Sequence, residues 1–392
     1  MPVLLDLTHT SHTRARTGVQ RVVRSLHRAL GERALGITHD PHLETWRALE
    51  AWELRNLAGD TPGRKRGASW PLARKLRSRL ARRFSSRARD AALARVGASG
   101  LIVPEVFSPA VAAALPGIFA ATRGARVAVF HDAIALRLPE LTPAKTVARF
   151  PAYLEELLAF DGIAAVSEDS RESLVDYWHW LGASQPPPVK AIPLGLAAKC
   201  HLLNDTSTDA GPPVVLSVGS IEGRKNHLAL LEACERLWAG GARFELHLIG
   251  LAQPQTGRAA LDRIGALQRA GRPLRYDGPV PDAALEAAYA RCTFTVYPSL
   301  MEGFGLPVLE SLARGKPCVC SARGALGESA RGGGSVALDR VDAAALAATI
   351  GRLLDSPVEL AALAAAARAR RMRSWSDFAD DLLAFLGELP RR

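Results

Sequence analysis

The chain has 392 residues, 48% of them hydrophobic and 23% charged, which predicts two globular domains with sizeable cores. No run of about 18 apolar residues occurs, which argues against a membrane-spanning helix, and we expect no signal peptide because the first residues lack a basic region. The five cysteines show no zinc-type spacing, and their odd number argues against a disulfide framework. This fits a reducing cytosol, so we expect a cytoplasmic protein.

The net charge of +11 has a local origin. Eleven Lys and Arg residues and no acid lie between Arg64 and Arg89, and leaving them out gives as many basic residues as the 39 acidic ones. The rest of the chain is therefore neutral. A globally basic protein would indicate nucleic-acid binding, but one basic segment on a neutral body does not, and we expect no nucleic-acid partner.

The N-terminal stretch has the order strand, loop, helix. Val3 to Leu7 is a short apolar run that suits a buried first strand, and the polar loop Thr8–Thr17 follows it. Gly18 then precedes a helix that we expect to run from about Val19 to Gly31. This order puts a helix N-terminus at the carboxyl end of a strand, where open α/β sheets bind ligands.

The basic segment 64–90 is predicted to be an amphipathic helix. Apolar residues recur in it at a spacing of four and draw one stripe, while the other faces are mostly Arg and Lys. Such a helix can lie on an anionic membrane surface or pack on its own domain, and the sequence leaves both open. RNA binding is the weakest interpretation because aromatic residues for base stacking are sparse. The stripe consists of Leu72, Leu76, Leu80 and Phe84.

Two further strands are expected at Leu101–Val103 and Val127–Phe130. The second ends in His131-Asp132, so His131 is expected to face the crevice at the carboxyl end of the sheet. A histidine at such a place is by itself more often a core or surface residue than a ligand.

The first half of the chain is expected to end in a polar linker. A strand near Ile163 leads into a helix for which Ser167 and Ser170 are both candidate N-caps. The run from Asn204 to Pro213 is polar and poor in hydrophobic residues, and we interpret it as the linker between two domains.

The second half opens with the apolar strand Val214–Val218, a turn at Gly219 and Ser220, and then a helix start. Arg224 and Lys225 lie at that start. Two cations beside a helix N-terminus form a favourable cradle for a diphosphate, although an Arg-Lys pair can also simply be solvated.

A second strand, glycine loop and helix follow at 293–328. The strand Phe294–Tyr297 is ended by Pro298. Gly303 and Gly305 flank Phe304 in a loop whose backbone can approach a ligand closely. A helix then runs from about Pro307 to Arg314 before the next strand begins at Cys318.

Two carboxylates flank this glycine loop. Glu302 lies just before it and Glu310 lies on the following helix, with seven residues between them. Acids beside a bound diphosphate would repel it, so these side chains suit hydroxyl groups, such as those of a sugar ring and a ribose. From spacing alone, a solvated Glu and a capping Glu in a buried loop remain an equal alternative.

The stretch from Glu302 to Glu310, with Ala-Arg-Gly-Lys-Pro behind it and a small-residue turn ending at Glu328, resembles a known signature. It is the Glu-x7-Glu motif of the retaining glycosyltransferases of family 4, the group 1 glycosyl transferases with the GT-B fold. The resemblance implies that Glu310 contacts the ribose and that Glu302 lies near the donor sugar. It further implies that the backbone from Gly303 through Phe304 and Gly305 to Leu306 meets the sugar and phosphates.

Three other stretches resemble the same family. Thr17 to Leu26 resembles its first loop and helix, which implies that Gly18 lies under the bound donor and acceptor. Ala128 to Asp132 resembles its strand ending in His-Asp, which assigns His131 to the donor-sugar pocket. The element from Gly219 to Asn226 resembles Gly-x-x-x-x-Arg-Lys-Asn, whose lysine meets the diphosphate. That lysine is Lys225 here. Ser220 stands where many relatives have an arginine, and Arg224 is a candidate to take over the share of that arginine.

The architecture that follows is an α/β protein with two Rossmann-like domains facing each other across a cleft. Residues 1–200 are expected to form the acceptor-side domain and 201–372 the nucleotide-sugar-binding domain. The helix in 373–392 is expected to cross back and pack on the first domain.

The function implied by the resemblance is transfer of a sugar from a nucleoside-diphosphate donor with retention of anomeric configuration. His131, Glu302 and Lys225 are the expected catalytic residues, and GDP-mannose is the favoured donor. The acceptor is expected to be a saccharide or a lipid-linked glycan of surface polysaccharide or glycolipid assembly, at the inner face of the cytoplasmic membrane. No Asp-x-Asp pair occurs, so we expect no metal requirement and no cofactor apart from the nucleotide sugar.

Two other functions stay open. One is a soluble GT-B enzyme of epimerase or phosphorylase type that acts on free sugars. The other is a non-enzymatic nucleic-acid-binding protein that uses the basic segment.

Overall fold

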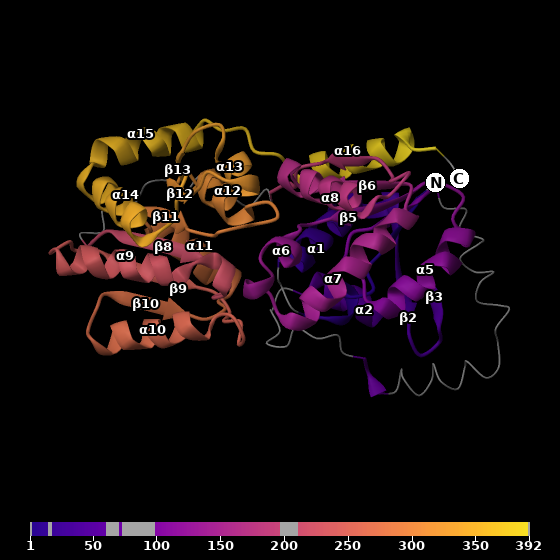
Figure 1. Cartoon of the computed structure of the whole chain (residues 1–392), viewed down its shortest axis with the longest axis horizontal. Coiled ribbons are helices and arrows are strands. Elements are labelled where there is room, and N and C mark those ends of the chain that lie inside the picture. The colour runs from indigo at the N-terminus through magenta and orange to yellow at the C-terminus, as the bar shows by residue number, and fades with distance from the viewer. Residues whose placement is uncertain (1, 15–17, 60–69, 73–98, 197–210, 391–392) are drawn as a thin grey trace.

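The computed structural model describes residues 2–14, 18–59, 70–72, 99–196 and 211–390. They form two α/β units that lie side by side, each with one central sheet and helices on both faces (Figure 1). The expected α/β fold class is confirmed. The helix predicted in the basic segment 64–90 lies outside the described residues except for 70–72, and so do the domain boundary at residue 200 and most of the linker Asn204–Pro213.

The N-terminal sheet has seven strands in the order β3-β2-β1-β4-β5-β6-β7. All neighbours are parallel except β2 and β3, which form an antiparallel edge. The central strands are buried on both faces, which is why they consist of short, continuous apolar runs. The strands are β1 (Val3–Asp6), β2 (Ala34–Asp40), β3 (Thr45–Ala48), β4 (Leu101–Val103), β5 (Arg126–Phe130), β6 (Gly162–Ala165) and β7 (Val189–Ala191).

The helices of this unit include those predicted after β1 and β6. Ser167 is the N-cap of the latter helix, and its Oγ accepts the backbone N–H of Ser170 at 3.1 Å. The region 40–63, where the sequence predicts no element, contains β3 and α2, and α2 begins with a capping box between Glu50 and Glu53. The helices are α1 (Gly18–Leu30), α2 (Ala51–Ala58), α5 (Pro109–Ala121), α6 (Ile134–Arg137), α7 (Ala144–Glu156) and α8 (Glu168–Leu181), with short 3-10 turns η1 (Thr10–His12), η2 (Gly31–Arg33), η3 (Pro139–Leu141) and η4 (Leu157–Ala159).

The C-terminal sheet has six parallel strands in the order β10-β9-β8-β11-β12-β13. The strands predicted to open this half and to precede the glycine loop are β8 and β11, and both are confirmed. The strands are β8 (Val214–Val218), β9 (Glu245–Ile249), β10 (Leu274–Asp277), β11 (Phe294–Tyr297), β12 (Cys318–Ser321) and β13 (Ser335–Leu338). The helices are η5 (Gly223–Lys225), α9 (His227–Ala239), α10 (Arg258–Arg269), α11 (Asp282–Arg291), α12 (Leu306–Ala313), α13 (Gly324–Ala330), α14 (Ala343–Asp355) and α15 (Pro357–Arg368).

The last helix, α16 (Trp375–Glu388), crosses back to the N-terminal unit as predicted (Figure 1). Its buried face, which includes Phe378 and Leu382, shares one hydrophobic core with Val3 and Leu5 of β1. The crossing passes close to the end of the N-terminal unit, where a Cβ on Gly195 would lie 2.1 Å from the carbonyl oxygen of Ser374. The backbone approach therefore requires glycine at that position.

The two sheets turn the carboxyl ends of their strands toward the same region. His131 follows β5, Gly219 follows β8, and the glycine loop follows β11. These are the ends at which open α/β sheets bind ligands. Among the described residues, no helix combines the length and the apolarity needed to cross a bilayer.

The return of α16 predicts a large loss of stability when its core contact is removed. Phe378 is completely buried, and we expect Phe378→Ala to lower the free energy of unfolding by about 3–5 kcal/mol because a cavity is left behind. Urea unfolding measures the difference. Ser376→Ala on the exposed side of the same helix should change stability by less than about 0.5 kcal/mol. Equal effects of the two substitutions would contradict the packing of α16.

Candidate functional site

A cluster of opposite charges lies where η5 meets the loop after β11. The Glu302 carboxylate accepts a hydrogen bond from Arg224 Nη1 at 2.7 Å and another from Lys225 Nζ. Arg224 also donates to the carbonyl of Met301 at 3.1 Å and pairs with Glu222 at 2.7 Å. The sequence placed Arg224, Lys225 and Glu302 in one site, and the structure brings them into direct contact.

The two basic side chains keep the Glu302 carboxylate ionised. Burial by itself raises the pKa of Glu302, but the positive charges of Arg224 and Lys225 outweigh it and lower the pKa to about 2. His227, the first residue of α9, is buried behind the cluster, and burial together with Lys225 lowers its pKa to about 3. The site therefore presents an ionised carboxylate in contact with Arg224 and Lys225, and one neutral imidazole behind them.

Gly303 forms a close contact between the two units. A Cβ on Gly303 would lie 2.3 Å from the carbonyl oxygen of His131, so only glycine fits there. The Gly303 carbonyl accepts hydrogen bonds from the hydroxyls of Ser167 at 2.7 Å and Ser170 at 3.3 Å, and the Ser170 hydroxyl also lies 3.1 Å from the His131 carbonyl. The loop after β11 is thereby held against the N-terminal unit.

His131 is a buried, oriented side chain. Its Nε2 lies 2.8 Å from the carbonyl of Pro104, and because a carbonyl only accepts, Nε2 carries the proton. Burial lowers the pKa of His131, which favours the neutral ring. The predicted position of His131 at the carboxyl end of β5 is confirmed, and its role toward a sugar stays a prediction.

The rest of the glycine loop leads into α12. Gly305 is the residue before the helix and has φ of +99°, a left-handed conformation that glycine adopts without strain. The Phe304 carbonyl accepts the Ser329 hydroxyl at 2.6 Å, and Leu306 is buried in the first turn. This leaves the start of α12 beside the Glu302 cluster, as the sequence predicts.

Glu310 has a partner that sequence reasoning missed. It lies on α12 and is 5% exposed, and its carboxylate is paired with the guanidinium of Arg21 on α1. Glu310 and Arg21 are 289 residues apart. The pair ties the helix predicted to bind the ribose to the first helix of the other unit. No local signal marks Arg21, because it reaches Glu310 only through the tertiary arrangement.

Three predicted donor-binding positions lie around these groups. Gly219 follows β8, and a Cβ there would lie 3.7 Å from Lys225 Cε, which is an ordinary van der Waals contact and places Gly219 beside the lysine side chain. Ser220 is half-buried in the same turn. Gly18 is the exposed first residue of α1, one helical turn before Arg21, and has open space around its Cα.

Two other carboxylates with structural roles were also missed. Glu328 accepts the backbone N–H groups of Glu168 and Asp169 at 3.0 and 2.8 Å, so a carboxylate of the C-terminal unit caps the N-terminus of α8. Glu105 accepts the N–H groups of His9 and Thr10 at 2.7 Å each and holds the loop after β1. Both contacts join segments that are far apart in the sequence, so spacing gave no sign of them.

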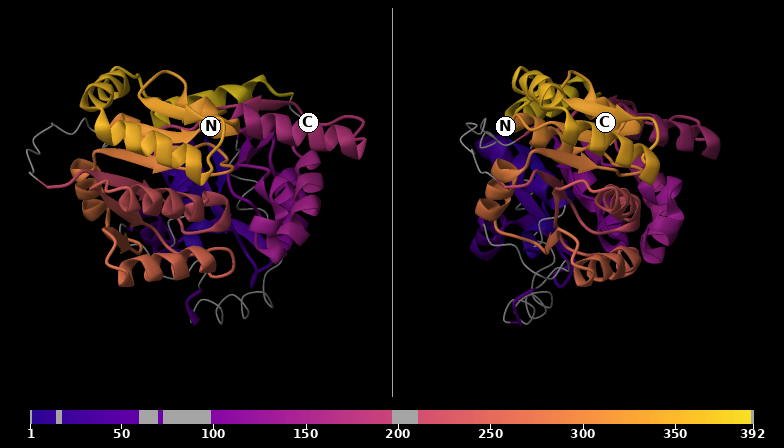
Figure 2. Two further views of the ribbon diagram at one scale, coloured as in Figure 1. Left: turned by 60° about the vertical axis from the view of Figure 1, so that its left-hand side comes forward. Right: turned by 90° about the vertical axis from the view of Figure 1, so that its left-hand side faces the viewer.

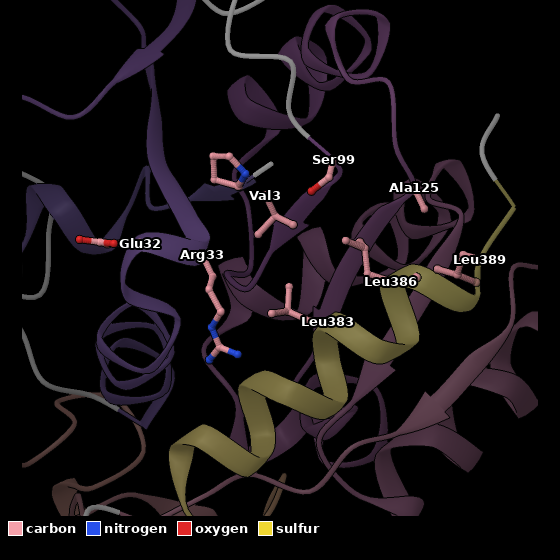
Figure 3. A pocket seen from close by; sticks show the side chains of 10 residues that line it. Val3, Glu32, Arg33, Ser99, Ala125, Leu383, Leu386 and Leu389 are labelled. Atoms are coloured by element: carbon pink, nitrogen blue, oxygen red, sulfur yellow. The ribbon is translucent and has the colours of Figure 1, made fainter.

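A separate pocket of about 600 Å³ lies at the amino ends of the strands of the N-terminal sheet. Figure 3 shows α16 along one side of it, with Val3 and Arg33 opposite. Its lining comes from the amino ends of β1, β4 and β5, whereas the charge cluster lies at carboxyl ends. The pocket is therefore distinct from the candidate site.

The chain matches a known protein family and is similar to known proteins over much of its length. The family described as "Glycosyl transferases group 1" matches residues 202–370. O-antigen chain mannosyltransferase B of Escherichia coli is 31% identical over 269 residues, which cover 64% of this chain and 67% of that protein. Serotype-specific mannosyltransferase WbdA of Escherichia coli is 25% identical over 339 residues, covering 81% of this chain but only 38% of that protein.

Solved structures share the whole fold. Sucrose-phosphate synthase of Thermosynechococcus elongatus superimposes with a TM-score of 0.70 at 20% identity, covering 99% of this chain and 98% of that one. HepE of Anabaena in complex with UDP-glucose superimposes with a TM-score of 0.69 at 16% identity, covering 99% and 100% of the two chains. At these identities the likeness concerns the fold.

The Glu302 cluster predicts a pH-dependent contribution to stability. The folded-state pKa of Glu302 is about 2 against an ordinary 4.5, so the contribution is complete above pH 4.5 and is lost as the pH falls toward 2. We expect Glu302→Gln to lower the free energy of unfolding at pH 7 by about 3 kcal/mol. Urea unfolding at about pH 7, 5 and 4 should show this difference shrinking below pH 4.5.

Glu232→Gln is the matched control, because Glu232 forms an exposed pair with Arg236 one turn along α9. It should change stability by less than about 0.5 kcal/mol. A Glu302→Gln difference that stays constant from pH 7 to pH 4 (about three units) would show that the carboxylate is not stabilised by its two cations.

Proposed function

The chain belongs to the group 1 glycosyl transferase family and has the GT-B fold, and from this premise we propose that it transfers a sugar, with retention of configuration, from a nucleoside-diphosphate donor. The observation that carries the proposal is the contact of Arg224 and Lys225 with Glu302 at a helix start. In the proposal the diphosphate binds to the two cations and the start of α12, while Glu302 and Glu310 accept hydroxyls of the sugar and the ribose.

The leaving diphosphate sets the chemical requirement. As the bond between the anomeric carbon and the phosphate oxygen breaks, negative charge grows on the phosphate and must be stabilised. Arg224 and Lys225 supply fixed positive charge, so the proposal needs no metal ion. The acceptor oxygen attacks the anomeric carbon from the face that the phosphate leaves, and its proton passes to that phosphate. His131, neutral and oriented by Pro104, is proposed to line the donor-sugar pocket.

We propose GDP-mannose as the donor and a saccharide or lipid-linked glycan of surface polysaccharide assembly as the acceptor. Support comes from the relatives, since an O-antigen chain mannosyltransferase and a serotype-specific mannosyltransferase are among them. HepE, which has the same fold, binds UDP-glucose, so the fold alone does not determine the base of the donor nucleotide. The base is therefore tested directly. GDP, UDP and dTDP are compared by thermal shift, and GDP should raise the melting temperature most.

Lys225→Ala should lower kcat by about 10²–10³-fold, because one fixed charge at the leaving group is lost. Release of GDP from GDP-mannose is measured with a fixed acceptor and with EDTA present. Lys190→Ala is the control, since Lys190 forms a surface pair with Glu388 away from the site. Unchanged turnover in Lys225→Ala would contradict the diphosphate assignment, and loss of wild-type activity in EDTA would contradict the metal-free mechanism.

For the basic segment 64–89 we propose attachment to an anionic membrane surface beside a lipid-linked acceptor. The protein should sediment with phosphatidylglycerol vesicles at low salt and dissociate at about 0.5 M salt, where surface charges are screened. Replacing its eleven Lys and Arg residues by Gln should abolish this binding, and vesicles of neutral lipid serve as the control. Equal binding by the Gln variant would show that the basic side chains of 64–89 do not attach the protein to the membrane. Packing on the protein's own domain would then be the remaining role of the segment.

A further inference from the structure

A hollow of about 530 Å³ lies on the outer side of the N-terminal unit, between α8 and the end of α6. In both views of Figure 2, α8 is the magenta helix that projects from the body of the molecule. No role has been given to this surface so far. The hollow is lined by Leu136, Arg137, Asp169, Glu172, Ser173, Asp176, Tyr177 and Trp180.

An exposed tryptophan beside a buried tyrosine forms the outer end of the hollow. Trp180 is 78% exposed, and its ring centroid lies 5.8 Å from that of Tyr177 at an interplanar angle of 36°. Trp180 thus offers a large aromatic face to a ligand lying in the hollow. The electron-rich face of an aromatic ring attracts polarised C–H groups, and one face of a pyranose ring consists of such groups.

The polar lining of the hollow offers hydrogen-bond partners to hydroxyl groups. Asp169, Glu172, Ser173 and Asp176 recur three to four residues apart, so they share one side of α8 with Trp180. Arg137 donates to Asp169 Oδ1 at 2.9 Å and to the Ser173 hydroxyl at 3.2 Å, and Arg171 lies 3.6 Å from Glu172. The lining therefore holds three carboxylates beside one guanidinium and the hydroxyl of Ser173, which places acceptors and donors side by side. Sugar hydroxyls both donate and accept.

The inner end of the hollow lies at the start of α8, next to residues that contact the glycine loop. Asp169 is in the first turn of α8, whose backbone N–H groups are capped by Glu328 of the C-terminal unit. The next residue, Ser170, hydrogen-bonds the carbonyls of His131 and Gly303. From Asp169 to Trp180 the helix rises about 16 Å, which is enough for several linked sugars. A glycan on α8 would therefore run toward the glycine loop.

We propose that this side of α8 is a saccharide-binding subsite that holds the distal sugars of an oligosaccharide acceptor, with Trp180 as the stacking platform. The inference rests on the proposed function, because it assumes that the acceptor is a glycan. It adds a preference for long acceptors over short ones, which the donor site alone does not provide.

The test compares Trp180→Ala with Val175→Ala, which removes an exposed apolar side chain from the opposite side of the same helix. Methyl α-mannoside, α-linked mannotetraose and maltotetraose are the acceptors. Trp180→Ala should raise KM for the better tetrasaccharide about tenfold, leave KM for methyl α-mannoside unchanged and leave kcat unchanged. Val175→Ala should match the wild type with each acceptor.

A second measurement does not depend on transfer. The same two tetrasaccharides are titrated into the full-length protein without donor, and binding is followed by calorimetry. Binding by the wild type and by Val175→Ala, with loss in Trp180→Ala, supports the subsite even if no sugar nucleotide is turned over. Binding that Trp180→Ala leaves intact, or no binding of either tetrasaccharide, overturns it. Salt-sensitive binding of oligolysine that Asp176→Asn abolishes, with no response to saccharides, would also overturn it in favour of a cationic partner.

Discussion

The contact of Glu302 with Arg224 and Lys225 is the interaction on which the candidate site depends. Two adjacent cations at a helix start repel each other and would be costly to bury without a counter-ion. Glu302 supplies that charge, and the backbone N–H of Leu300 adds a hydrogen bond of 2.8 Å to the Arg224 carbonyl. The loop after β11 is therefore held against η5 from two sides. The same contact orients both cations before any substrate arrives, which limits the reorganisation that binding requires.

The two units meet through backbone groups, charges and apolar side chains. Gly303 approaches the His131 carbonyl too closely for any side chain, and Glu328 caps a helix that belongs to the other unit. Arg21 and Glu310 add an ion pair across the same boundary. Leu306 of α12 is buried in one hydrophobic core with α1 and the buried face of α16. Apolar contact of this kind restricts the relative motion of domains more than a purely polar interface does.

The sequence was most informative where one segment determines its own structure. The apolar runs of β1, β5, β8 and β11 and the glycine loop before α12 have local patterns of strand, turn and helix, so their places were predictable. The side chains of Arg224, Lys225 and Glu302 follow from strand ends that the sheet brings together. Arg21, Glu105 and Glu328 were not predictable, because each acts on a segment distant in the chain. The antiparallel edge strand β3 and the short helix α2 were missed because neither has a strong hydrophobic period.

The ion pairs at Glu302 and Glu310 link substrate binding to the arrangement of the two units. Both carboxylates are the groups proposed to receive hydroxyls of the donor, and both are already engaged by cations of this chain. A donor that takes Glu310 must displace Arg21, and a diphosphate that takes Lys225 must loosen its contact with Glu302. Each displacement exchanges a protein contact for a ligand contact, so only the difference in free energy contributes to affinity. Because the Arg21–Glu310 pair spans the two units, donor binding and domain arrangement are then coupled, and each must influence the other to the same extent.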